Sequence, residues 1–229
     1  MTVAVVIVAA GSGERLGAGI PKAFVALQGR PILDWAVDAF NGHPDVSSVV
    51  IVAPAEPGVG SAQATALAER LGDRVVVVPG GISRQQSVRS GLAALPGETE
   101  FVLIHDAARP LVPADVIGSV VAALRQGADA VIPVLPVPDT IKRVDPSGLV
   151  TGTLDRSELR AVQTPQGFRR SALLSAHRAA LDQGLHEITD DAGVMEAAGY
   201  VVHTVPGSPA AFKITTPHDL ALAQLLVTR

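Results

Sequence analysis

The chain of 229 residues contains no cysteine and few aromatic side chains. The absence of cysteine excludes disulfides, thiolate catalysis and zinc sites ligated by cysteine. Aromatic residues make up only 3% of the chain, which argues against single-stranded nucleic-acid binding, because that binding relies on aromatic stacking. The formal net charge of -4 argues against a duplex binder, which would be basic. We therefore expect no nucleic-acid partner.

Long hydrophobic runs are also missing. The N-terminal apolar run, residues 3–9, is too short to span a bilayer and lacks the basic region that begins a signal peptide. Apolar residues nevertheless make up 48% of the sequence, which is enough for a sizeable core. We expect a cytoplasmic protein with no membrane partner. Because no low-complexity linker interrupts the chain, we expect a single domain over residues 1–229.

Short apolar runs alternate with helical stretches along most of the chain. Five runs without polar alternation predict strands that are buried on both faces of a parallel sheet. These predicted strands are residues 3–9, 49–53, 75–78, 101–104 and 130–134. Helices are predicted at residues 32–40, 61–71, 84–95 and 114–126. The alternation predicts an α/β fold, a three-layer doubly wound sandwich with a mostly parallel central sheet.

The alternation breaks after residue 135. Two extended segments around the turn signal Asp145-Pro146-Ser147-Gly148 predict a β-hairpin arm over residues 136–156, inserted into the sandwich. A lone hairpin is marginal in water, so the arm is expected to pack on a second copy of the chain or on its own domain, and the residues leave both open. Near the C-terminus, residues 211–216 are interpreted as a strand that leads into a helix beginning at Pro217 or just before.

The first predicted strand runs directly into a glycine-rich loop, residues 10–22, which contains Arg15 and Lys22. Glycine lets the backbone approach a ligand, successive N–H groups form an anion-binding concavity, and the two cations add charge. Leu16 replaces the last glycine of a dinucleotide fingerprint, and Ala23 follows the lysine where a P-loop has a hydroxyl. The loop therefore predicts phosphate binding mainly by side-chain cations, with a surface loop of solvated charges as the alternative.

Polar residues follow two other predicted strands, where ligands bind in open α/β sheets. Asp106 is placed to hold Mg²⁺, which binds one or two carboxylates plus substrate phosphates, and an ion pair with Arg109 is the alternative. Gly80 and Gly81, followed by Ser83, Arg84 and Gln85, expose backbone groups that could recognise a base edge. They also fit a strand-to-helix turn in which Ser83 is the N-cap, and the two interpretations are compatible.

Three further polar positions have a structural interpretation or an open one. His105 is interpreted as structural, because it has no partners for nucleophilic chemistry. The segment Thr189-Asp190-Asp191 predicts a cap and a first helical turn rather than a second metal site. Lys213 stands inside an apolar run, so its ammonium group either extends to solvent or points into a polar cleft.

Taken together, segments from nearly the whole chain resemble the 2-C-methyl-D-erythritol 4-phosphate cytidylyltransferases. They are residues 9–16, 21–22, 80–81, 84, 87, 105–110, 139–142, 163–168, 189–192, 213–217 and 219–220. The opening loop alone indicates only a nucleotidyltransferase, whereas its combination with H-D-A-A-R-P, T-P-Q-G-F and K-I-T-T-P is much more specific. One departure is Ala211-Phe212, where many relatives carry asparagine and an aliphatic residue.

The resemblance implies a Rossmann-like nucleotidyltransferase that forms a homodimer, its subunits interlocked through the hairpin arms. It implies transfer of a cytidylyl group from CTP to 2-C-methyl-D-erythritol 4-phosphate with Mg²⁺ as cofactor, in the non-mevalonate route to isoprenoid precursors. The acceptor phosphate is already anionic at neutral pH, so no general base is required. Alternatives are a cytidylyltransferase for another polyol phosphate such as ribitol 5-phosphate, a pyrophosphorylase for a sugar 1-phosphate, and a non-catalytic nucleotide-binding regulator.

The resemblance also implies roles for individual residues. The implied catalytic residues are Arg15, Lys22, Arg156 and Lys213. The implied nucleotide-binding residues are Ala9, Ala10, Gly11, Gly13, Gly81, Ser87, Asp106 and Ala107, and Asp106 is also the implied metal ligand. The implied residues for the acceptor substrate are Arg109, Thr140, Arg156, Thr164 and Lys213. Of these, Thr140 and Arg109 are expected to contribute across the dimer interface.

Overall fold

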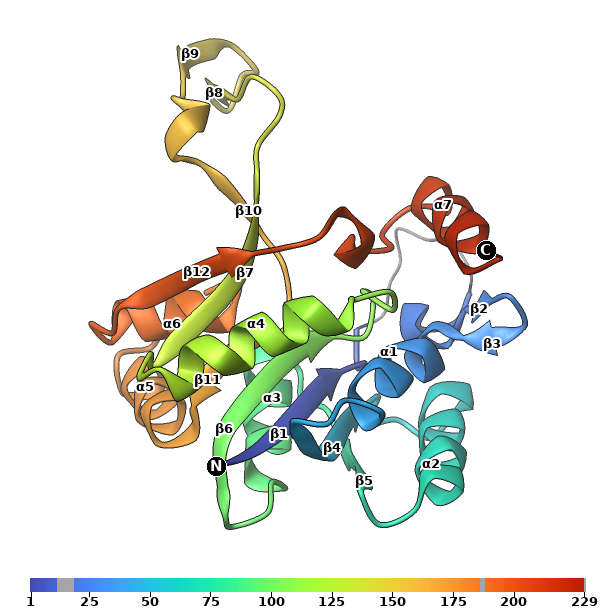
Figure 1. Cartoon of the computed structure of the whole chain (residues 1–229). Helices are drawn as coiled ribbons and strands as arrows, with labels where there is room; N and C mark the ends of the chain where they lie inside the picture. The colour runs from blue at the N-terminus through green and yellow to red at the C-terminus, as the bar shows by residue number, and fades with distance from the viewer. Residues whose placement is uncertain (12–18, 186–187, 229) are drawn as a thin grey trace.

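Figure 1 shows the computed structural model, which describes residues 1–11, 19–185 and 188–228. A central sheet dominates the described part of the chain. Its strands are β1 (Thr2–Val8), β4 (Val46–Ala53), β5 (Val75–Pro79), β6 (Thr99–Asp106), β7 (Ala130–Pro136), β10 (Arg160–Val162), β11 (Gln166–Arg169) and β12 (Val202–Pro206). The strand order is β10-β7-β11-β6-β1-β4-β5, and β12 also pairs with β7.

The sheet is mostly parallel. Strands β6, β1, β4 and β5 form an unbroken parallel block, and β12 is parallel to β7. The short strands β10 and β11 are antiparallel to their neighbours, and β11 lies between β6 and β7. The prediction of an α/β fold with a mostly parallel central sheet is therefore confirmed.

Helices cover both faces of this sheet (Figure 1). They are α1 (Ile32–Asn41), α2 (Val59–Leu71), α3 (Arg84–Ala93), α4 (Ala114–Arg125), α5 (Arg170–Asp182) and α6 (Asp191–Ala197). Successive side chains of β1 alternate between the faces, as a strand requires. Val3 and Val5 join a core with α1, α2 and α4, whereas Ala4 and Val6 join a second core with α3, α5 and α6. The predicted three-layer sandwich is confirmed, and the four predicted helices differ from those found by at most two residues at either end.

Smaller elements complete the chain. They are the short helices η2 (Lys22–Phe24), η3 (Arg156–Glu158) and η4 (Pro209–Ala211), the pair β2 (Ala26–Leu27) and β3 (Arg30–Pro31), and α7 (Pro217–Val227). A satellite cluster that includes Leu27 and Ile214 packs α7 against β2. No helix in the described part of the chain has the length and apolar character needed to cross a bilayer.

A separate hairpin projects away from the central sheet, at the top of Figure 1. It consists of β8 (Lys142–Val144) and β9 (Val150–Thr153), which pair antiparallel. The Asp145 carboxylate closes the turn by accepting hydrogen bonds from the backbone of Ser147 and Leu149. Val144, Leu149 and Val150 leave large apolar side chains exposed on the hairpin.

The strand predicted at residues 211–216 is wrong. A short helix, η4, ends at Ala211 and an irregular segment then runs to the N-cap of α7, Thr216. The Asp219 carboxylate accepts the backbone N–H groups of Thr215 and Thr216, which removes two donors that a strand ladder would use. Ile214 in this segment donates its backbone N–H to the carbonyl of Ala108.

Candidate active site

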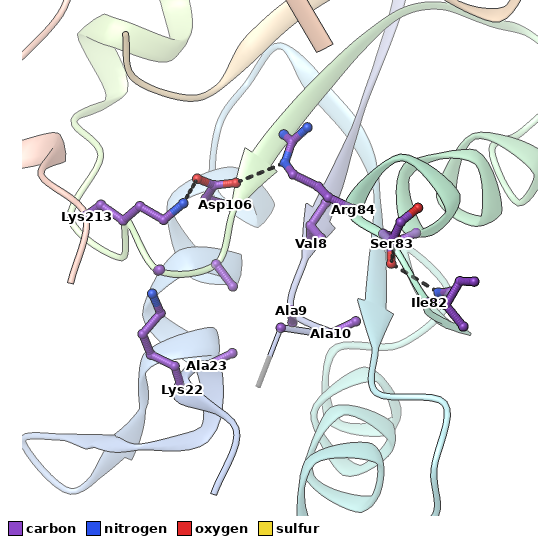
Figure 2. Close-up of a pocket in the computed structure, with 15 residues that line it drawn as sticks. Val8, Ala9, Ala10, Lys22, Ala23, Ile82, Ser83, Arg84, Asp106 and Lys213 are labelled. Atoms are coloured by element: carbon purple, nitrogen blue, oxygen red, sulfur yellow. Dashed lines mark hydrogen bonds and ion pairs between the residues drawn. The ribbon is translucent and has the colours of Figure 1, made fainter. Parts of the chain in front are cut away.

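A cleft of about 350 Å³ lies at the carboxyl ends of β1, β5 and β6 (Figure 2). It is lined by residues from the segments that follow each strand and by one residue near the C-terminus. These are Val8, Ala9, Ala10, Gly11, Lys22, Ala23, Gly81, Ile82, Ser83, Arg84, Ser87, Asp106, Ala107, Ala108 and Lys213. The location is the usual one for ligands in open α/β sheets.

Glycines allow the backbone to pass close to itself at one wall of the cleft. A Cβ atom on Gly80 would lie 2.5 Å from the Cβ of Ala10, so no larger residue fits there without a shift. The next residue, Gly81, donates its N–H to the Ser87 hydroxyl at 3.1 Å. Ser83 caps α3 by accepting the N–H of Gln86, so the predicted strand-to-helix turn is confirmed.

Asp106, the last residue of β6, holds two cations from opposite sides of the cleft (Figure 2). Its Oδ2 lies 2.8 Å from Lys213 Nζ, and its Oδ1 lies 3.8 Å from Arg84 Nε. Burial alone would raise the pKa of Asp106, but the charges of Lys213 and Arg84 outweigh burial and lower the pKa to about 2. Asp106 is therefore ionised throughout the neutral range. Lys213 points into the cleft, which agrees with one of the two interpretations of this residue from the sequence.

Buried polar groups hold Asp106 from beneath. The hydroxyl of Thr164 accepts the backbone N–H of Asp106 at 3.1 Å and lies 3.1 Å from His105 Nδ1. The other ring nitrogen of His105 lies 3.1 Å from the carbonyl of Arg109. Burial lowers the pKa of His105 to about 4, so the ring is neutral at physiological pH. This agrees with the structural interpretation of His105.

The alternative ion pair between Asp106 and Arg109 is wrong. The Arg109 guanidinium instead donates to the carbonyls of Ala211 and Val162, at 2.8 and 3.3 Å. It thereby ties the end of β6 to the C-terminal segment. The ion pairs of Asp106 among the described residues are those with Lys213 and Arg84.

Most of the predicted nucleotide-binding residues lie at the cleft. These are Ala9, Ala10, Gly11, Gly81, Ser87, Asp106 and Ala107, and the predicted catalytic residues Lys22 and Lys213 join them. Lys22 begins η2 directly after Pro21. The predictions for Arg15 and Gly13 lie outside the described residues.

The remaining predicted residues do not line this cleft. Thr140 and Arg156 are exposed in the segments that carry the hairpin, where Arg156 donates to the carbonyl of Pro138. Thr164 and Arg109 lie behind Asp106, as described above.

The sequence placed Arg84 in the segment that could recognise a base edge, but it did not predict the ion pairs of Arg84 with Asp106 and Asp191. The available signal was its position as the first residue of a helix that follows the glycine turn, directly after the N-cap Ser83. That position directs its side chain toward the strand ends.

Histidine and acidic side chains are the candidate metal ligands in the described residues, because the chain has no cysteine. No group of three or more histidine or acidic side chains in these ranges is arranged to hold a metal ion. Asp190 and Asp191 form the N-cap and first turn of α6, as predicted, with the Asp190 carboxylate accepting the N–H of Gly193 at 2.9 Å. Among the described residues that line the cleft, Asp106 is the one carboxylate available to a cation.

Comparisons with known proteins agree with this geometry. The 2-C-methyl-D-erythritol 4-phosphate cytidylyltransferase family matches this chain over residues 3–229. A protein of that name from Streptomyces coelicolor is 49% identical over 99% of this chain and 85% of its own length. One from Nocardia farcinica is 49% identical over 100% of this chain and 95% of its own length.

Solved structures show the same fold. The 2-C-methyl-D-erythritol 4-phosphate cytidylyltransferase from Thermus thermophilus superposes with a TM-score of 0.80 at 38% identity, covering 100% of both chains. The 4-diphosphocytidyl-2C-methyl-D-erythritol synthase from Anaerococcus prevotii superposes with a TM-score of 0.86 at 26% identity, covering 100% of this chain and 99% of that one. With a family match over almost every residue, this chain belongs to the 2-C-methyl-D-erythritol 4-phosphate cytidylyltransferase family.

Proposed function

We propose that this protein transfers a cytidylyl group from CTP to 2-C-methyl-D-erythritol 4-phosphate. The products are 4-diphosphocytidyl-2-C-methyl-D-erythritol and pyrophosphate, in the non-mevalonate isoprenoid pathway. The observation that carries this proposal is the convergence of Lys22, Asp106 and Lys213 on one cleft at the strand ends. Family membership and the names of the relatives support the choice of substrates. Because the reaction uses CTP, we propose the cytoplasm as its location.

The reaction joins two phosphates and requires no general base. An oxygen of the acceptor phosphate attacks the α-phosphorus of CTP, a new P–O bond forms, and the bond from that phosphorus to the bridging oxygen breaks. Pyrophosphate leaves with the electron pair. The attacking group carries its charge at neutral pH, since a phosphate monoester has a second pKa of about 6. The protein must therefore bring two anions together and stabilise charge at the α-phosphate, as in phosphoryl transfer generally.

Lys22 and Lys213 are the described cations proposed for this task. Both line the cleft and lie on the same side of it in Figure 2, with Lys213 nearer to Asp106. Arg15 is proposed to act with Lys22, by the resemblance of its loop. A positioned cation stabilises negative charge in the transition state at little reorganisation cost, because its place is fixed before the substrates bind.

The cytosine base is proposed to lie against Gly81 and Ser87. The short turn before α3 leaves its backbone open to the cleft, and Ser87 supplies a hydroxyl in the same region. The residues proposed to hold the rest of the nucleotide are Ala9, Ala10, Gly11, Gly13 and Ala107. Backbone N–H groups of such turns bind anionic and polar ligand atoms without side chains in the way.

Mg²⁺ is the proposed cofactor, with Asp106 as its ligand from the protein. The residue fits a hard cation, because its carboxylate opens into the cleft and its low pKa keeps it ionised. When bound, the ion would neutralise charge on the triphosphate. In the structure, Lys213 and Arg84 both contact the Asp106 carboxylate and hold it in place at the cleft.

The hairpin over residues 136–156 is proposed to be the dimer contact of a single nucleotidyltransferase domain. Its exposed Val144, Leu149 and Val150 are apolar side chains that a second copy would cover. Thr140 and Arg156 lie on the same projecting segment and outside the cleft. We propose that they, together with Arg109, complete the acceptor site of the partner subunit.

Complementation between two inactive variants tests the exchange of arms. Lys22→Ala removes a group from the cleft, and Arg156→Ala removes a group from the arm. If the arm acts in the partner subunit, equal mixing restores about a quarter of wild-type activity, because half of the dimers are hybrids with one intact site. If the arm acts in its own subunit, the mixture stays inactive.

A steady-state assay of pyrophosphate release tests the proposed reaction. Purified protein receives CTP and Mg²⁺ with either 2-C-methyl-D-erythritol 4-phosphate or ribitol 5-phosphate. We expect kcat/KM to be far higher for the methylerythritol phosphate. Preference for ribitol 5-phosphate would assign a different acceptor to the same cleft, and no release with either would contradict the proposed activity.

A further inference from the structure

A fully buried carboxylate lies behind Arg84, outside the cleft. Asp191, the first residue of α6, has no exposed side-chain surface, and its Oδ2 lies 2.7 Å from Arg84 Nη1. Behind it, His177 of α5 places Nε2 at 3.3 Å from Asp191 Oδ1, and this ring is 2% exposed. Beyond these two contacts, neither carboxylate oxygen has a hydrogen-bond partner in the described residues.

Arg84 therefore faces two carboxylates with different surroundings. Asp191 is sealed from solvent, whereas Asp106 opens into the cleft and also contacts Lys213. The guanidinium group is a rigid planar fork, so holding Nη1 on Asp191 restricts the positions that Nε can reach. In the structure Nε points toward Asp106 at 3.8 Å.

Burial makes the ion pair between Arg84 and Asp191 costly to break. A buried charge without a partner is very costly, so Asp191 has to keep the guanidinium beside it. Burial alone would lower the pKa of Arg84, but Asp191 and then Asp106 raise it above its usual value. Arg84 is thus a cation that is held in place by Asp191. Without this partner, its long side chain would sample many rotamers.

We propose that Asp191, supported by His177, is a positioning residue that acts on the reaction through Arg84. The buried pair fixes the Arg84 guanidinium against Asp106 and so keeps both groups in place on the nucleotide side of the cleft. The layer formed by α5 and α6 is in this way connected to the site at the strand ends. The inference rests on the proposed function, because the loss that it expects is measured on that reaction.

A double-mutant cycle tests whether Asp191 acts through Arg84. Asp191→Asn keeps the shape of the side chain and removes its charge. Alone, it is expected to lower kcat/KM for CTP about tenfold, within the range of measured couplings between contacting residues. In an Arg84→Gln background the same change is expected to have less than about a twofold effect, because the group it positions is gone. Equal losses in both backgrounds would overturn the inference.

The orientation of Arg84 has a direct readout by NMR. In protein labelled with ¹⁵N-arginine, the Arg84 Nε–Hε signal is identified by its loss in Arg84→Gln. We expect a rigid group in the wild type and, in Asp191→Asn, an order parameter that falls below about 0.6. An Arg84 group that stays rigid in Asp191→Asn would contradict a positioning role.

A second ion pair, between a largely buried aspartate and an arginine whose side chain is 58% exposed, supplies the control. Asp34 of α1 lies 2.7 Å from Arg70, has a side chain that is 10% exposed, and does not line the cleft. Asp34→Asn is expected to leave kcat/KM and the Arg84 signal unchanged. A loss of activity equal to that of Asp191→Asn would mean that removing any such pair is enough, and would overturn the proposal.

A replacement variant and an activity measurement on the wild type keep the test decisive. If Asp191→Asn does not fold, His177→Leu replaces it in the cycle, with an expected loss of a few fold that disappears in Arg84→Gln. A loss that persists in that background would refute the proposal. Failure of the proposed function is distinguishable, because the wild type would then release no pyrophosphate from CTP and methylerythritol phosphate.

Discussion

The low pKa of Asp106 makes a quantitative prediction about stability in acid. The pKa falls from 3.8, the ordinary value for an aspartate side chain, to about 2 in the folded protein. Each pKa unit corresponds to about 1.4 kcal/mol, so ionised Asp106 contributes about 2.5 kcal/mol to the free energy of unfolding. The side chain is only 15% exposed, which limits screening by solvent.

The sign follows from the direction of the shift. A folded-state pKa below the unfolded value gives a contribution that is complete well above pH 3.8 and is lost as the pH falls through about 2. Between pH 5 and pH 3, the linkage relation gives a loss of about 1 kcal/mol. Asp106→Asn does not titrate and lacks this loss.

Urea unfolding of the wild type and Asp106→Asn, measured in EDTA at pH 5, 4 and 3, tests the prediction. The difference between their free energies of unfolding is expected to shrink by about 1 kcal/mol over this range. Ser87→Ala serves as a control, since it removes a cleft hydroxyl that does not titrate, and its difference from wild type is expected to stay constant. A constant or growing difference for Asp106→Asn would refute the electrostatic argument.

Three other substitutions test the site and the core. Lys22→Ala is expected to lower kcat by about 10²–10³ while the melting temperature is retained, and near-normal kcat would remove Lys22 from the mechanism. Gly91→Ala places a Cβ 2.4 Å from a valine methyl of β1 and is expected to lower the free energy of unfolding in urea by about 1–3 kcal/mol. Its control is Gly118→Ala, whose Cβ meets nothing closer than 3.9 Å and which should not destabilise the protein. Thr164→Val removes the acceptor of the Asp106 N–H and is expected to lower the free energy of unfolding by about 1–3 kcal/mol, which Thr164→Ser should restore. A Thr164→Val protein as stable as the wild type would show that this hydrogen bond does not matter for stability.

The strands that the sequence predicted well are those covered by helices on both faces. In such strands almost every residue is apolar, as in residues 3–9, so the pattern is visible without any partner. Strand β11, Gln166–Arg169, was not predicted because Phe168 is its only large apolar side chain. Its position between β6 and β7 is set by antiparallel pairing with distant segments, which leaves no local periodicity.

The residues of the candidate site were predictable where they directly follow buried strands. Loops after predicted strands identified Lys22 and Asp106, because parallel strands end at one edge of the sheet. The sequence could not show which carboxylate Arg84 would face, since Asp106 and Asp191 lie on different layers. It also could not show that Arg109 would bind carbonyl groups, because that contact depends on how the C-terminal segment returns to β6.

Charge in the cleft determines how the proposed reaction depends on pH. Among the described residues that line it, Lys22, Arg84 and Lys213 outnumber the single carboxylate Asp106, so this described part of the cleft has an excess of positive charge. Because the pKa of Asp106 is about 2, this excess stays the same from mildly acidic to neutral pH. The groups that change charge in this range belong to the substrates: the terminal phosphate of CTP and the acceptor phosphate, whose second pKa is about 6. The substrates themselves, rather than a catalytic base of the protein, therefore set the acid limb of the rate.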